Sequence, residues 1–375
     1  MNLVFFVSSL NAGGAERVAC TLANAWARRG DRVTLVVTHM ASRKSFYPLD
    51  RDVRIVWLGQ SQQPLWHRLC PPLAKWLAMR SLVKRIAPDV VLSFLTNVNV
   101  NVLIACGGLD VPVVVSERTN PVHSSSAGWV LRQLRRRLYG RAAAVVVQSA
   151  DSVPGFEQMV PAMRALHVVP NPLPTDLPFA SRAPHGAARP HIVAMGRLVE
   201  SKQFDQLIQA FAAVAASHQE WDLVIWGDGP LHDTLTRQVN ELALSGRVLL
   251  KGKTQRPWEA LREGSLFAMT SRVEGFPNVL LEAMGIGLPC VVMDCPSGPA
   301  EMTRQGRDGL LVGLNSVTGL SRALGQLMGD SEWREQLGRQ AAQSVRERYA
   351  LPVVLNTWDD VFASVTATGA AHEQS

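Results

Sequence analysis

The fold class is decided by residues 1–30, which read MNLVFFVSSLNAGGAERVACTLANAWARRG. The apolar run Leu3–Val7 is typical of a buried β-strand, and the amphipathic stretch Glu16–Arg29 predicts a helix that ends at Gly30. No basic segment precedes the apolar run, so we expect a first strand and not a secretion signal. A fully apolar strand followed by a helix indicates a parallel sheet that is covered on both faces.

The same alternation of apolar strands and amphipathic helices continues along nearly the whole chain. The first half predicts further strands at Arg32–Thr38, Arg54–Leu58, Val90–Phe94, Val113–Ser116 and Ala144–Gln148. The second half predicts them at His191–Met195, Asp222–Trp226, Arg247–Lys251, Leu266–Thr270 and Cys290–Met293. Between the two halves, six prolines at positions 170–190 disfavour both helix and central strand.

We therefore predict an α/β protein with two doubly wound parallel-sheet domains. Their expected bounds are 1–170 and 191–351, joined by a linker at 171–190. A helix at 352–366 is expected to cross back to the first domain, and the last residues are expected to be disordered. Ligands of such sheets bind beyond the carboxyl ends of the strands, so two domains that face each other define a cleft.

Composition narrows the classes of protein that fit the chain. The 375 residues suit two domains, and a hydrophobic share of 47% is enough for two cores. The five cysteines form no C-x-x-C pair, which indicates neither a disulfide framework nor a thiolate metal site. Residues 1–175 hold 20 Lys and Arg against 9 Asp and Glu, whereas the remainder holds 18 against 22. We therefore expect only the first half to meet an anionic partner.

The densest group of candidate ligand-binding residues is the segment Glu274-Gly-Phe-Pro-Asn-Val-Leu-Leu-Glu282. Pro277 suits the first position of a helix, which puts the two glutamates on the order of 10 Å apart. The amides between them, at the positive end of the helix, belong to Asn278, Val279 and Leu280. Two acids on either side of a phosphate site suit a nucleotide sugar. The alternative is that both glutamates are ordinary solvated helix residues.

A second group follows the strand His191–Met195 and reads Gly196-Arg-Leu-Val-Glu-Ser-Lys202. Arg197 and Lys202 come at the carboxyl end of this strand, where the ligand crevice is expected. Two cations there can neutralise a diphosphate leaving group. The alternative is a pair of surface cations.

A third group, Gly13-Gly14-Ala15-Glu16, lies between the first strand and the first helix. Glycine lets a ligand approach the backbone closely, and the exposed end of the helix attracts anions. The segment lacks the G-x-G-x-x-G pattern, which disfavours an NAD-dependent dehydrogenase. An ordinary turn between strand and helix is the alternative.

Taken in order, these motifs and the segment Trp226-Gly-Asp-Gly-Pro230 resemble the GT-B glycosyltransferases of the large family 4. The chain is most similar to the bacterial enzymes that extend lipid-linked glycans, and Ser116-Glu-Arg-Thr-Asn-Pro121 is similar to a segment of their N-acetylgalactosaminyltransferase branch. The resemblance implies two Rossmann-like domains and retaining transfer of an N-acetylhexosamine. It also implies a UDP-sugar donor and a lipid-linked acceptor in surface polysaccharide, lipopolysaccharide or glycan-precursor assembly.

The resemblance further assigns roles to individual residues. It gives Arg197 and Lys202 to the diphosphate, Glu274 to the hydroxyls of the transferred sugar and Glu282 to the ribose. The glycines that it places around the donor are Gly13, Gly14, Gly196, Gly227 and Gly229. Many relatives have a histidine after the strand that ends here at Ser116. This chain has Glu117 and Arg118 there, with His123 further on, so the residue that contacts the sugar on that side is left open.

Neither a cofactor nor a metal is expected. Asp50-Arg-Asp52 matches the D-x-D of metal-using transferases, but those enzymes have another fold, and here the segment lies in a polar connection. The leaving phosphate can itself take the proton of the acceptor, so the implied reaction requires no protein base.

Two basic stretches of the first half, Trp66–Arg85 and Trp129–Arg141, mix Trp and Leu with Lys and Arg at helical spacing. This pattern suits helices that lie on an anionic bilayer, although ordinary helices with a charged outer face are the alternative. No stretch is apolar enough to span a membrane, and no nucleic-acid-binding motif accompanies the charge. We expect peripheral attachment to the cytoplasmic face of a bacterial inner membrane, where a polyprenyl-diphosphate-linked acceptor lies.

Two alternative functions remain open at this point. One is a sugar-nucleotide epimerase of the same fold, which needs no acceptor. The other is a non-catalytic nucleotide-sugar-binding protein, which would never release the nucleoside diphosphate. The sequence does not identify the donor, the acceptor, the linkage or the oligomeric state.

Overall fold

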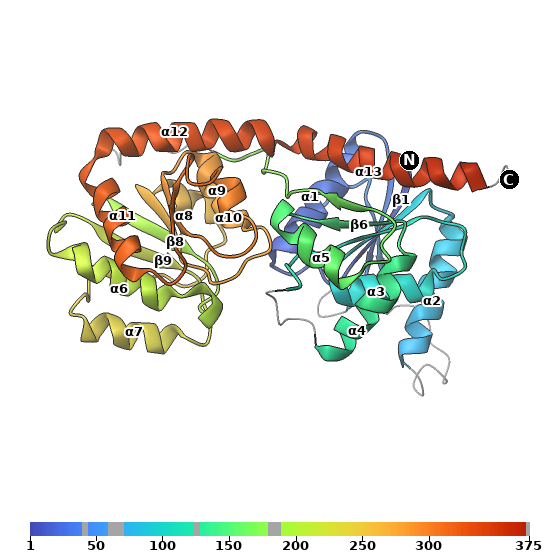
Figure 1. Cartoon of the computed structure of the whole chain (residues 1–375), viewed down its shortest axis with the longest axis horizontal. Coiled ribbons are helices and arrows are strands. Elements are labelled where there is room, and N and C mark those ends of the chain that lie inside the picture. The colour runs from blue at the N-terminus through green and yellow to red at the C-terminus, as the bar shows by residue number, and fades with distance from the viewer. Residues whose placement is uncertain (40–43, 59–70, 123–127, 179–188, 373–375) are drawn as a thin grey trace. The chain divides into compact units, whose positions relative to one another are not determined.

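The computed structural model describes residues 1–39, 44–58, 71–122, 128–178 and 189–372 (Figure 1). The chain divides into two compact units, which are Met1–Pro172 with Val354–Ser375 (unit 1) and Leu173–Val353 (unit 2). Each unit contains one sheet, of seven strands in unit 1 and six in unit 2, and all strand pairs in both sheets are parallel. The predicted fold class, two doubly wound parallel sheets, is confirmed.

The sheet of unit 1 has the strand order β3-β2-β1-β4-β5-β6-β7. Its strands are β1 (Asn2–Val7), β2 (Arg32–Val37), β3 (Arg54–Trp57), β4 (Val90–Phe94), β5 (Val113–Ser116), β6 (Ala144–Val147) and β7 (Leu166–Val168). Its helices are α1 (Gly14–Arg28), α2 (Pro71–Ile86), α3 (Thr96–Ala105), α4 (Trp129–Leu138), α5 (Val153–Met159) and most of α13 (Leu351–His372).

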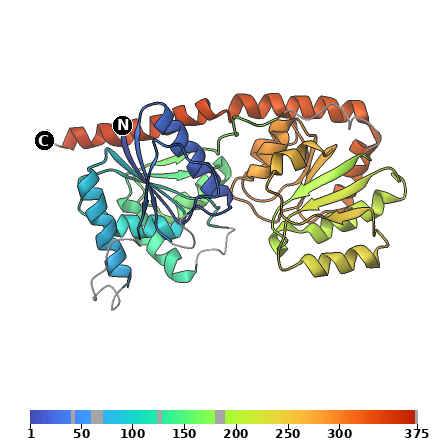
Figure 2. The ribbon, with the colours of Figure 1, turned by 180° about the vertical axis from the view of Figure 1, so that it is seen from behind.

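The strands of this sheet are apolar because side chains of both faces are buried. Val4 and Phe6 pack on the face that carries α2, α3 and α5, whereas Phe5 contacts Trp26 of α1 on the opposite face. Figure 2 shows α1 on the side of the sheet that is turned away in Figure 1. Successive residues of a strand point to opposite faces, so both layers of helices are specified by one strand.

The final helix, α13, completes the core of unit 1. Trp358 is 1% exposed, and its ring centroid lies 6.1 Å from that of Trp26 and 6.2 Å from that of Phe94. At the surface, Arg29 pairs with Asp359 at 2.6 Å. The helix continues to His372, which corrects the expectation that order ends near residue 366. No proline intervenes between Thr366 and His372, and the Thr366 hydroxyl donates to the Phe362 carbonyl at 2.9 Å.

Unit 2 has the strand order β10-β9-β8-β11-β12-β13. Its strands are β8 (His191–Met195), β9 (Asp222–Trp226), β10 (Val248–Leu250), β11 (Leu266–Met269), β12 (Cys290–Met293) and β13 (Leu310–Val312). Its helices are α6 (Phe204–Ala215), α7 (His232–Glu241), α8 (Pro257–Arg262), α9 (Asn278–Ile286), α10 (Pro299–Met302), α11 (Val317–Gly329) and α12 (Ser331–Arg348). One face of the sheet packs against α6, α7 and α11, and the other against α8, α9 and α12.

The chain enters unit 2 at Leu173, inside the segment expected to be a linker. The amide of Leu173 donates to the carbonyl of Tyr349 at 2.7 Å, and Leu173 forms a parallel bridge with Ala350. These contacts attach Leu173 to unit 2 next to the point where the chain leaves that unit at Val353. Residues 179–188 of the expected linker lie outside the described part of the chain.

Candidate active site

The strand order of unit 2 reverses between β8 and β11, which are hydrogen-bonded neighbours. Ligands of doubly wound sheets bind beyond the carboxyl ends of the strands at such a reversal. The loop after β8 carries Lys202, and the loop after β11 carries Glu274. The fold thus brings together two motifs that are 72 residues apart in the chain.

Two hydrogen bonds tie these loops to each other. The amide of Arg272 donates to the carbonyl of Ser201 at 2.8 Å, and the Thr270 hydroxyl donates to the carbonyl of Lys202 at 2.8 Å. Lys202 ends a short 3₁₀ turn and is followed by Gln203, which has a left-handed backbone (φ 49°). The backbone of Lys202 is therefore held on both sides, which fixes the point from which its side chain extends.

Lys202 and Glu274 form the central ion pair of this site. The Lys202 Nζ donates to the Glu274 Oε1, and their side chains are 23% and 13% exposed. Arg197, earlier in the β8 loop, has an exposed side chain. The partly shielded lysine is neutralised by Glu274 when no ligand is bound, so an anionic ligand has to compete with this carboxylate.

The glycines of unit 2 allow the loops after β8 and β9 to touch through their backbones. Gly227 has φ +144°, and a Cβ there would lie 1.8 Å from the carbonyl oxygen of Gly196. A Cβ on Gly229 would lie 2.5 Å from the carbonyl oxygen of Leu198. The amide of Gly196 donates to the carbonyl of Trp226 at 3.0 Å. These positions require glycine for the shape of the loops, and their contact with a donor stays a prediction.

Helix α9 differs in two details from what its sequence predicts. Pro277 is the residue before the helix, not its first residue. The amide of Leu280 donates to the carbonyl of Pro277 at 3.0 Å, which corrects the expectation that this amide binds a phosphate. For Asn278 and Val279 that role stays a prediction. Glu282, in the same helix, is 2% exposed, and its contact with a ribose also stays a prediction.

One candidate of this site was missed by the sequence analysis. Arg272 lies between β11 and Glu274, has an exposed side chain and is joined to the Lys202 loop by its backbone. It is a further cation beside the switch point. The signal was present in the sequence, because Arg272 follows a predicted strand by two residues, as Arg197 does.

In unit 1 the glycine pair begins α1 at the carboxyl end of β1. Gly13 has an extended backbone, and its amide donates to the Tyr47 hydroxyl at 3.3 Å. Gly14 is the first residue of the helix. The Ser9 hydroxyl donates to Glu16 at 3.0 Å, which connects the end of the strand with the first turn of α1. This geometry is that of a strand–helix turn, and binding of a donor at the turn stays a prediction.

The residues that replace the expected histidine are buried within unit 1. Glu117 is 2% exposed, and its carboxylate accepts hydrogen bonds from the hydroxyls of Tyr139 and Thr96. Arg135 lies 3.8 Å away. Burial raises the pKa of Glu117 even though Arg135 and the hydroxyls favour its charged form. Because the carboxylate is enclosed by groups of its own unit, Glu117 is disfavoured as the candidate for the sugar contact that the sequence left open.

Arg118 is enclosed in the same way. It is 7% exposed, its guanidinium lies 4.2 Å from the centroid of the Phe94 ring, and its Nη2 donates to Asn171. Burial lowers the pKa of Arg118 to about 9. Packing between Phe94 and Asn171 turns the side chain into the unit, which disfavours Arg118 as the candidate for the sugar contact that the sequence left open. His123, the third candidate, lies outside the described residues.

One carboxylate of the D-x-D segment, that of Asp50, is hydrogen-bonded to protein groups. Asp50 accepts a hydrogen bond from Arg28 at 3.0 Å and one from the amide of Asp52 at 3.2 Å. The hydrogen bond from Asp52, followed by the one from Arg28, lowers the pKa of Asp50. The carboxylate therefore shapes a turn in unit 1.

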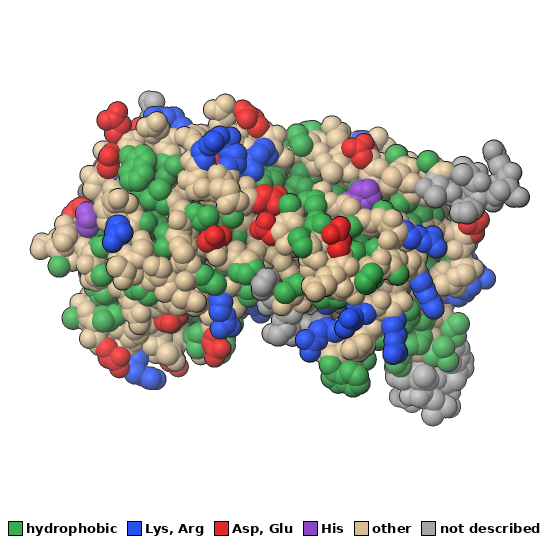
Figure 3. Space-filling view, in the orientation of Figure 1, with side chains coloured by type: hydrophobic (Ala, Val, Ile, Leu, Met, Phe, Trp, Pro, Cys, Tyr) green, Lys and Arg blue, Asp and Glu red, His purple; other side chains and the backbone are tan. Residues whose placement is uncertain are grey.

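A surface of unit 1 combines exposed apolar and basic side chains on α2 and α4. The apolar members are Leu73, Leu77, Trp129 and Val130, which are 45% to 71% exposed. The exposed cations are Lys84, Arg85, Arg132, Arg136 and Arg137. Figure 3 shows Lys and Arg side chains gathered over this region of unit 1, beside a hydrophobic protrusion. We call these nine residues the α2–α4 surface.

Two findings refine the sequence prediction for this surface. Arg135 is 2% exposed and pairs with Glu117, so it does not belong to the basic face. Residues 66–70 of the first basic stretch lie outside the described residues. Within the part of the chain that the structure describes, no helix is both long and apolar enough to cross a membrane.

The two halves of the chain match two known protein families. Residues 13–172 match the glycosyl transferase 4-like domain, and residues 180–344 match the glycosyl transferases group 1. These matches cover most of both units, and the parallel sheets are those of the GT-B fold. The chain is thus a sugar-transferring enzyme, and it belongs to the family 4 glycosyltransferases with the GT-B fold.

Individual relatives extend over the full chain. An N-acetylgalactosaminyltransferase of Campylobacter jejuni that acts on a GalNAc-containing undecaprenyl-diphosphate glycan is 27% identical, over 97% of this chain and 99% of the relative. The amylovoran biosynthesis glycosyltransferase AmsD of Erwinia amylovora is 27% identical over 94% and 96%. The crystal structure of Anabaena HepE with UDP superposes with a TM-score of 0.79 at 21% identity, covering 97% of this chain and all of that one.

Proposed function

We propose that the protein is a retaining glycosyltransferase that moves an N-acetylhexosamine from a UDP-sugar to a lipid-linked saccharide in bacterial glycan assembly. The observation that carries this proposal is the Lys202–Glu274 pair at the strand reversal of unit 2. A cation and an acid held on neighbouring loops provide one group for a diphosphate and one for sugar hydroxyls. The UDP bound to HepE and the glycan substrate named for the C. jejuni relative support this choice of donor and acceptor.

In the proposed reaction, the bond between the anomeric carbon and the diphosphate breaks while an acceptor hydroxyl attacks from the same face. Lys202, with Arg197 and Arg272 on the same pair of loops, stabilises the negative charge that grows on the leaving phosphate. Electrostatic stabilisation of this kind is usually the largest catalytic contribution. The leaving phosphate oxygen takes the proton of the acceptor hydroxyl. Glu274, released from Lys202, accepts hydrogen bonds from the hydroxyls of the transferred sugar.

The reaction is proposed to need no metal. The oxygens of Asp50 already accept hydrogen bonds from Arg28 and the amide of Asp52. The charge that a metal would neutralise is assigned to Arg197 and Lys202. Turnover that is unchanged by EDTA and by added Mg²⁺ or Mn²⁺ is expected, and a strict requirement for either ion would contradict this part.

The donor is identified by a thermal-shift panel of UDP, GDP and their N-acetylhexosamine and hexose derivatives. A ligand that binds the folded state raises the melting temperature by mass action, so the true donor gives the largest shift. UDP-N-acetylgalactosamine is the expected donor. A shift with GDP-sugars alone would refute the UDP assignment.

Release of UDP then separates the three candidate functions. A transferase releases UDP from the donor at a rate that rises when a polyprenyl-diphosphate-linked saccharide is added. An epimerase converts the donor with no acceptor and no net release of UDP. A non-catalytic binding protein does neither. Only the first result agrees with the proposal.

We also assign the α2–α4 surface to contact with the cytoplasmic face of the inner membrane, where a lipid-linked acceptor is held. Apolar side chains enter the interface between headgroups and acyl chains, and nearby cations meet anionic headgroups. Flotation with vesicles containing phosphatidylglycerol is expected to carry the protein upward at low salt, and less so for a Trp129→Ser, Val130→Ser variant. Equal flotation with purely zwitterionic vesicles, or none at low salt, would contradict the assignment.

A further inference from the structure

The loop that carries Glu274 is supported from behind by an aromatic contact. Phe276, two residues after Glu274, is 5% exposed, and its ring meets the ring of Tyr349 edge to face, with centroids 5.5 Å apart and planes at 78°. Edge-to-face pairs are a preferred arrangement of aromatic rings. Tyr349 is 3% exposed. The position of the loop therefore depends on where the Tyr349 ring is held.

Tyr349 is held by its neighbour Arg348 and by the backbone. The Arg348 Nη1 donates to the Tyr349 hydroxyl at 2.9 Å, and its guanidinium lies 4.6 Å from the centroid of the Tyr349 ring. The Tyr349 amide donates to the carbonyl of Val345, and its carbonyl accepts from the amide of Leu173. The position of the Tyr349 ring is thus fixed by Arg348 and by backbone hydrogen bonds, independently of Phe276.

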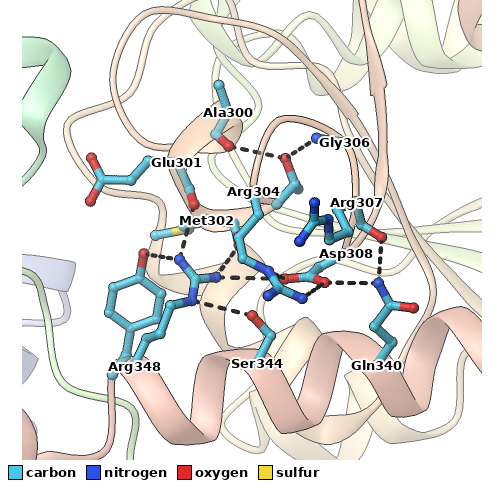
Figure 4. Close-up of polar contacts among 12 residues, drawn as sticks. Ala300, Glu301, Met302, Arg304, Gly306, Arg307, Asp308, Gln340, Ser344 and Arg348 are labelled. Carbon is cyan, nitrogen blue, oxygen red and sulfur yellow. Dashed lines mark hydrogen bonds and ion pairs between the residues drawn. The ribbon is translucent and has the colours of Figure 1, made fainter.

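Arg348 is itself fixed by a network that reaches the loop before β13 (Figure 4). It donates to the carbonyls of Glu301 at 3.0 Å and Met302 at 2.5 Å, and its Nη2 lies 3.8 Å from the carboxylate of Asp308. Asp308 is fully buried and accepts two hydrogen bonds from Arg304, at 2.5 and 2.6 Å. A guanidinium that satisfies several acceptors at once has little freedom to move.

The opposite side of the Glu274 loop is also confined. The amide of Glu274 donates to the carbonyl of Pro296 at 3.4 Å. A Cβ on Gly298, which has φ +104°, would lie 2.7 Å from the Cδ of Pro277. The segment Pro296–Gly298 therefore closes on the loop in front of α9. Phe276 and Pro277 are enclosed between this segment and Tyr349.

We propose that Tyr349, held by Arg348, is a positioning residue for Glu274 and so determines the affinity of the enzyme for the sugar of its donor. This inference rests on the proposed role of Glu274 as a ligand of the sugar hydroxyls. Tyr349 does not touch the donor but acts through the ring of Phe276. The chain passes from unit 2 to unit 1 four residues later, after Val353.

The test compares the affinities for UDP and UDP-N-acetylgalactosamine, measured by isothermal titration calorimetry on the full chain. The dissociation constant of UDP divided by that of UDP-N-acetylgalactosamine measures how much the sugar adds to the affinity. Effects on binding of the diphosphate cancel in this ratio. Tyr349→Leu is expected to reduce the advantage of the sugar nucleotide about tenfold, the worth of a hydrogen bond to a charged group. UDP alone should bind within about threefold of wild type. Tyr349→Phe keeps the ring contact with Phe276 but loses the hydrogen bond from Arg348, so a smaller reduction than that of Tyr349→Leu is expected.

A double variant distinguishes positioning from a general loss of structure. Glu274→Gln alone should reduce the ratio about tenfold, and adding Tyr349→Leu should reduce it little further, because residues that act as one unit are not additive. Phe276→Leu removes the other ring and should reproduce Tyr349→Leu, which keeps the test open if one variant does not fold.

Each other outcome overturns a defined part of the account. If Glu274→Gln leaves the ratio unchanged, or wild type binds neither ligand, the proposed role of Glu274 fails and the inference falls with it. If Glu274→Gln reduces the ratio but both ring variants leave it unchanged, the inference alone fails. It also fails if the ring variants weaken UDP and UDP-N-acetylgalactosamine equally, or if their effects multiply with that of Glu274→Gln.

Discussion

Replacing Lys202 by methionine tests the proposed diphosphate site, because it removes the charge and keeps a similar aliphatic stem. In the free enzyme Lys202 pairs with Glu274, and the two side chains are 23% and 13% exposed. A hydrogen bond to a charged phosphate oxygen is worth about 1.5–3 kcal/mol. Breaking a partly exposed ion pair first costs up to about 1 kcal/mol. The net loss on substitution is therefore about 0.5–3 kcal/mol, or about 2- to 150-fold weaker binding of UDP.

Calorimetric titration of UDP into the purified protein measures this loss. Arg339→Gln is the matched control: Arg339 lies on α12, is 64% exposed and pairs with Glu335 at 3.3 Å, so its removal changes net charge equally without touching the site. The companion variant Glu274→Gln should bind UDP more tightly than wild type, because Lys202 no longer has to break an ion pair with a carboxylate. Binding of UDP by Lys202→Met within twofold of wild type would refute the electrostatic argument.

Three further predictions concern the structure that supports the site. Gly227→Ala should destabilise unit 2 by about 2 kcal/mol or more in urea unfolding, because its Cβ would overlap the Gly196 carbonyl. Gly246→Ala is the control, since Gly246 also has a positive φ but open space around its Cβ position, and it should cost about 1–2 kcal/mol. Asp308→Asn should lower the free energy of unfolding by about 3 kcal/mol at pH 7. Burial alone would raise the pKa of Asp308, but hydrogen bonds, led by that from Arg304, lower it below 3.8. Wild type should therefore lose this stability as pH falls below about 4, and the free energy of unfolding of the variant should depend less on pH in that range. Trp358→Ala should cost unit 1 about 3–5 kcal/mol, and a loss below about 1 kcal/mol would contradict the view that α13 completes its core.

The fold could be predicted from sequence because its central strands are buried on both faces. Val90–Phe94 and His191–Met195 are apolar runs with polar or glycine-rich ends, and the structure gives them the predicted bounds. The strands Leu166–Val168 and Leu310–Val312 were not predicted. Each has three residues, which gives a weak apolar pattern, although the equally short strand Val248–Leu250 was predicted within Arg247–Lys251. Both lie at the edge of their sheet, where only one neighbouring strand specifies them.

The candidate site could be predicted in part. Lys202 and Glu274 each follow a predicted strand, and a parallel sheet puts such residues along one edge. Their direct pairing depends on β8 lying next to β11, which residue patterns do not reveal. Glu117 shows the opposite case, since it follows a predicted strand and was one of three candidates left open for the sugar contact. Only the fold shows that Tyr139, 22 residues further on, encloses it.

The aromatic contact behind the Glu274 loop also could not be predicted from the sequence. Phe276 and Tyr349 are separated by the helices α9 to α12 and the strands β12 and β13, and nothing in either local pattern links them. Packing of α12 against α9 brings the end of one helix to the start of the other. Contacts of this kind depend on the arrangement of helices in three dimensions.

The most direct test of the central claim is a crystal structure of the protein with UDP-N-acetylgalactosamine. In this complex we expect Lys202 to leave Glu274 and to donate to a diphosphate oxygen at about 2.7–3.2 Å, with Glu274 turned to the sugar hydroxyls. A complex in which the diphosphate binds elsewhere while Lys202 and Glu274 remain paired would contradict it.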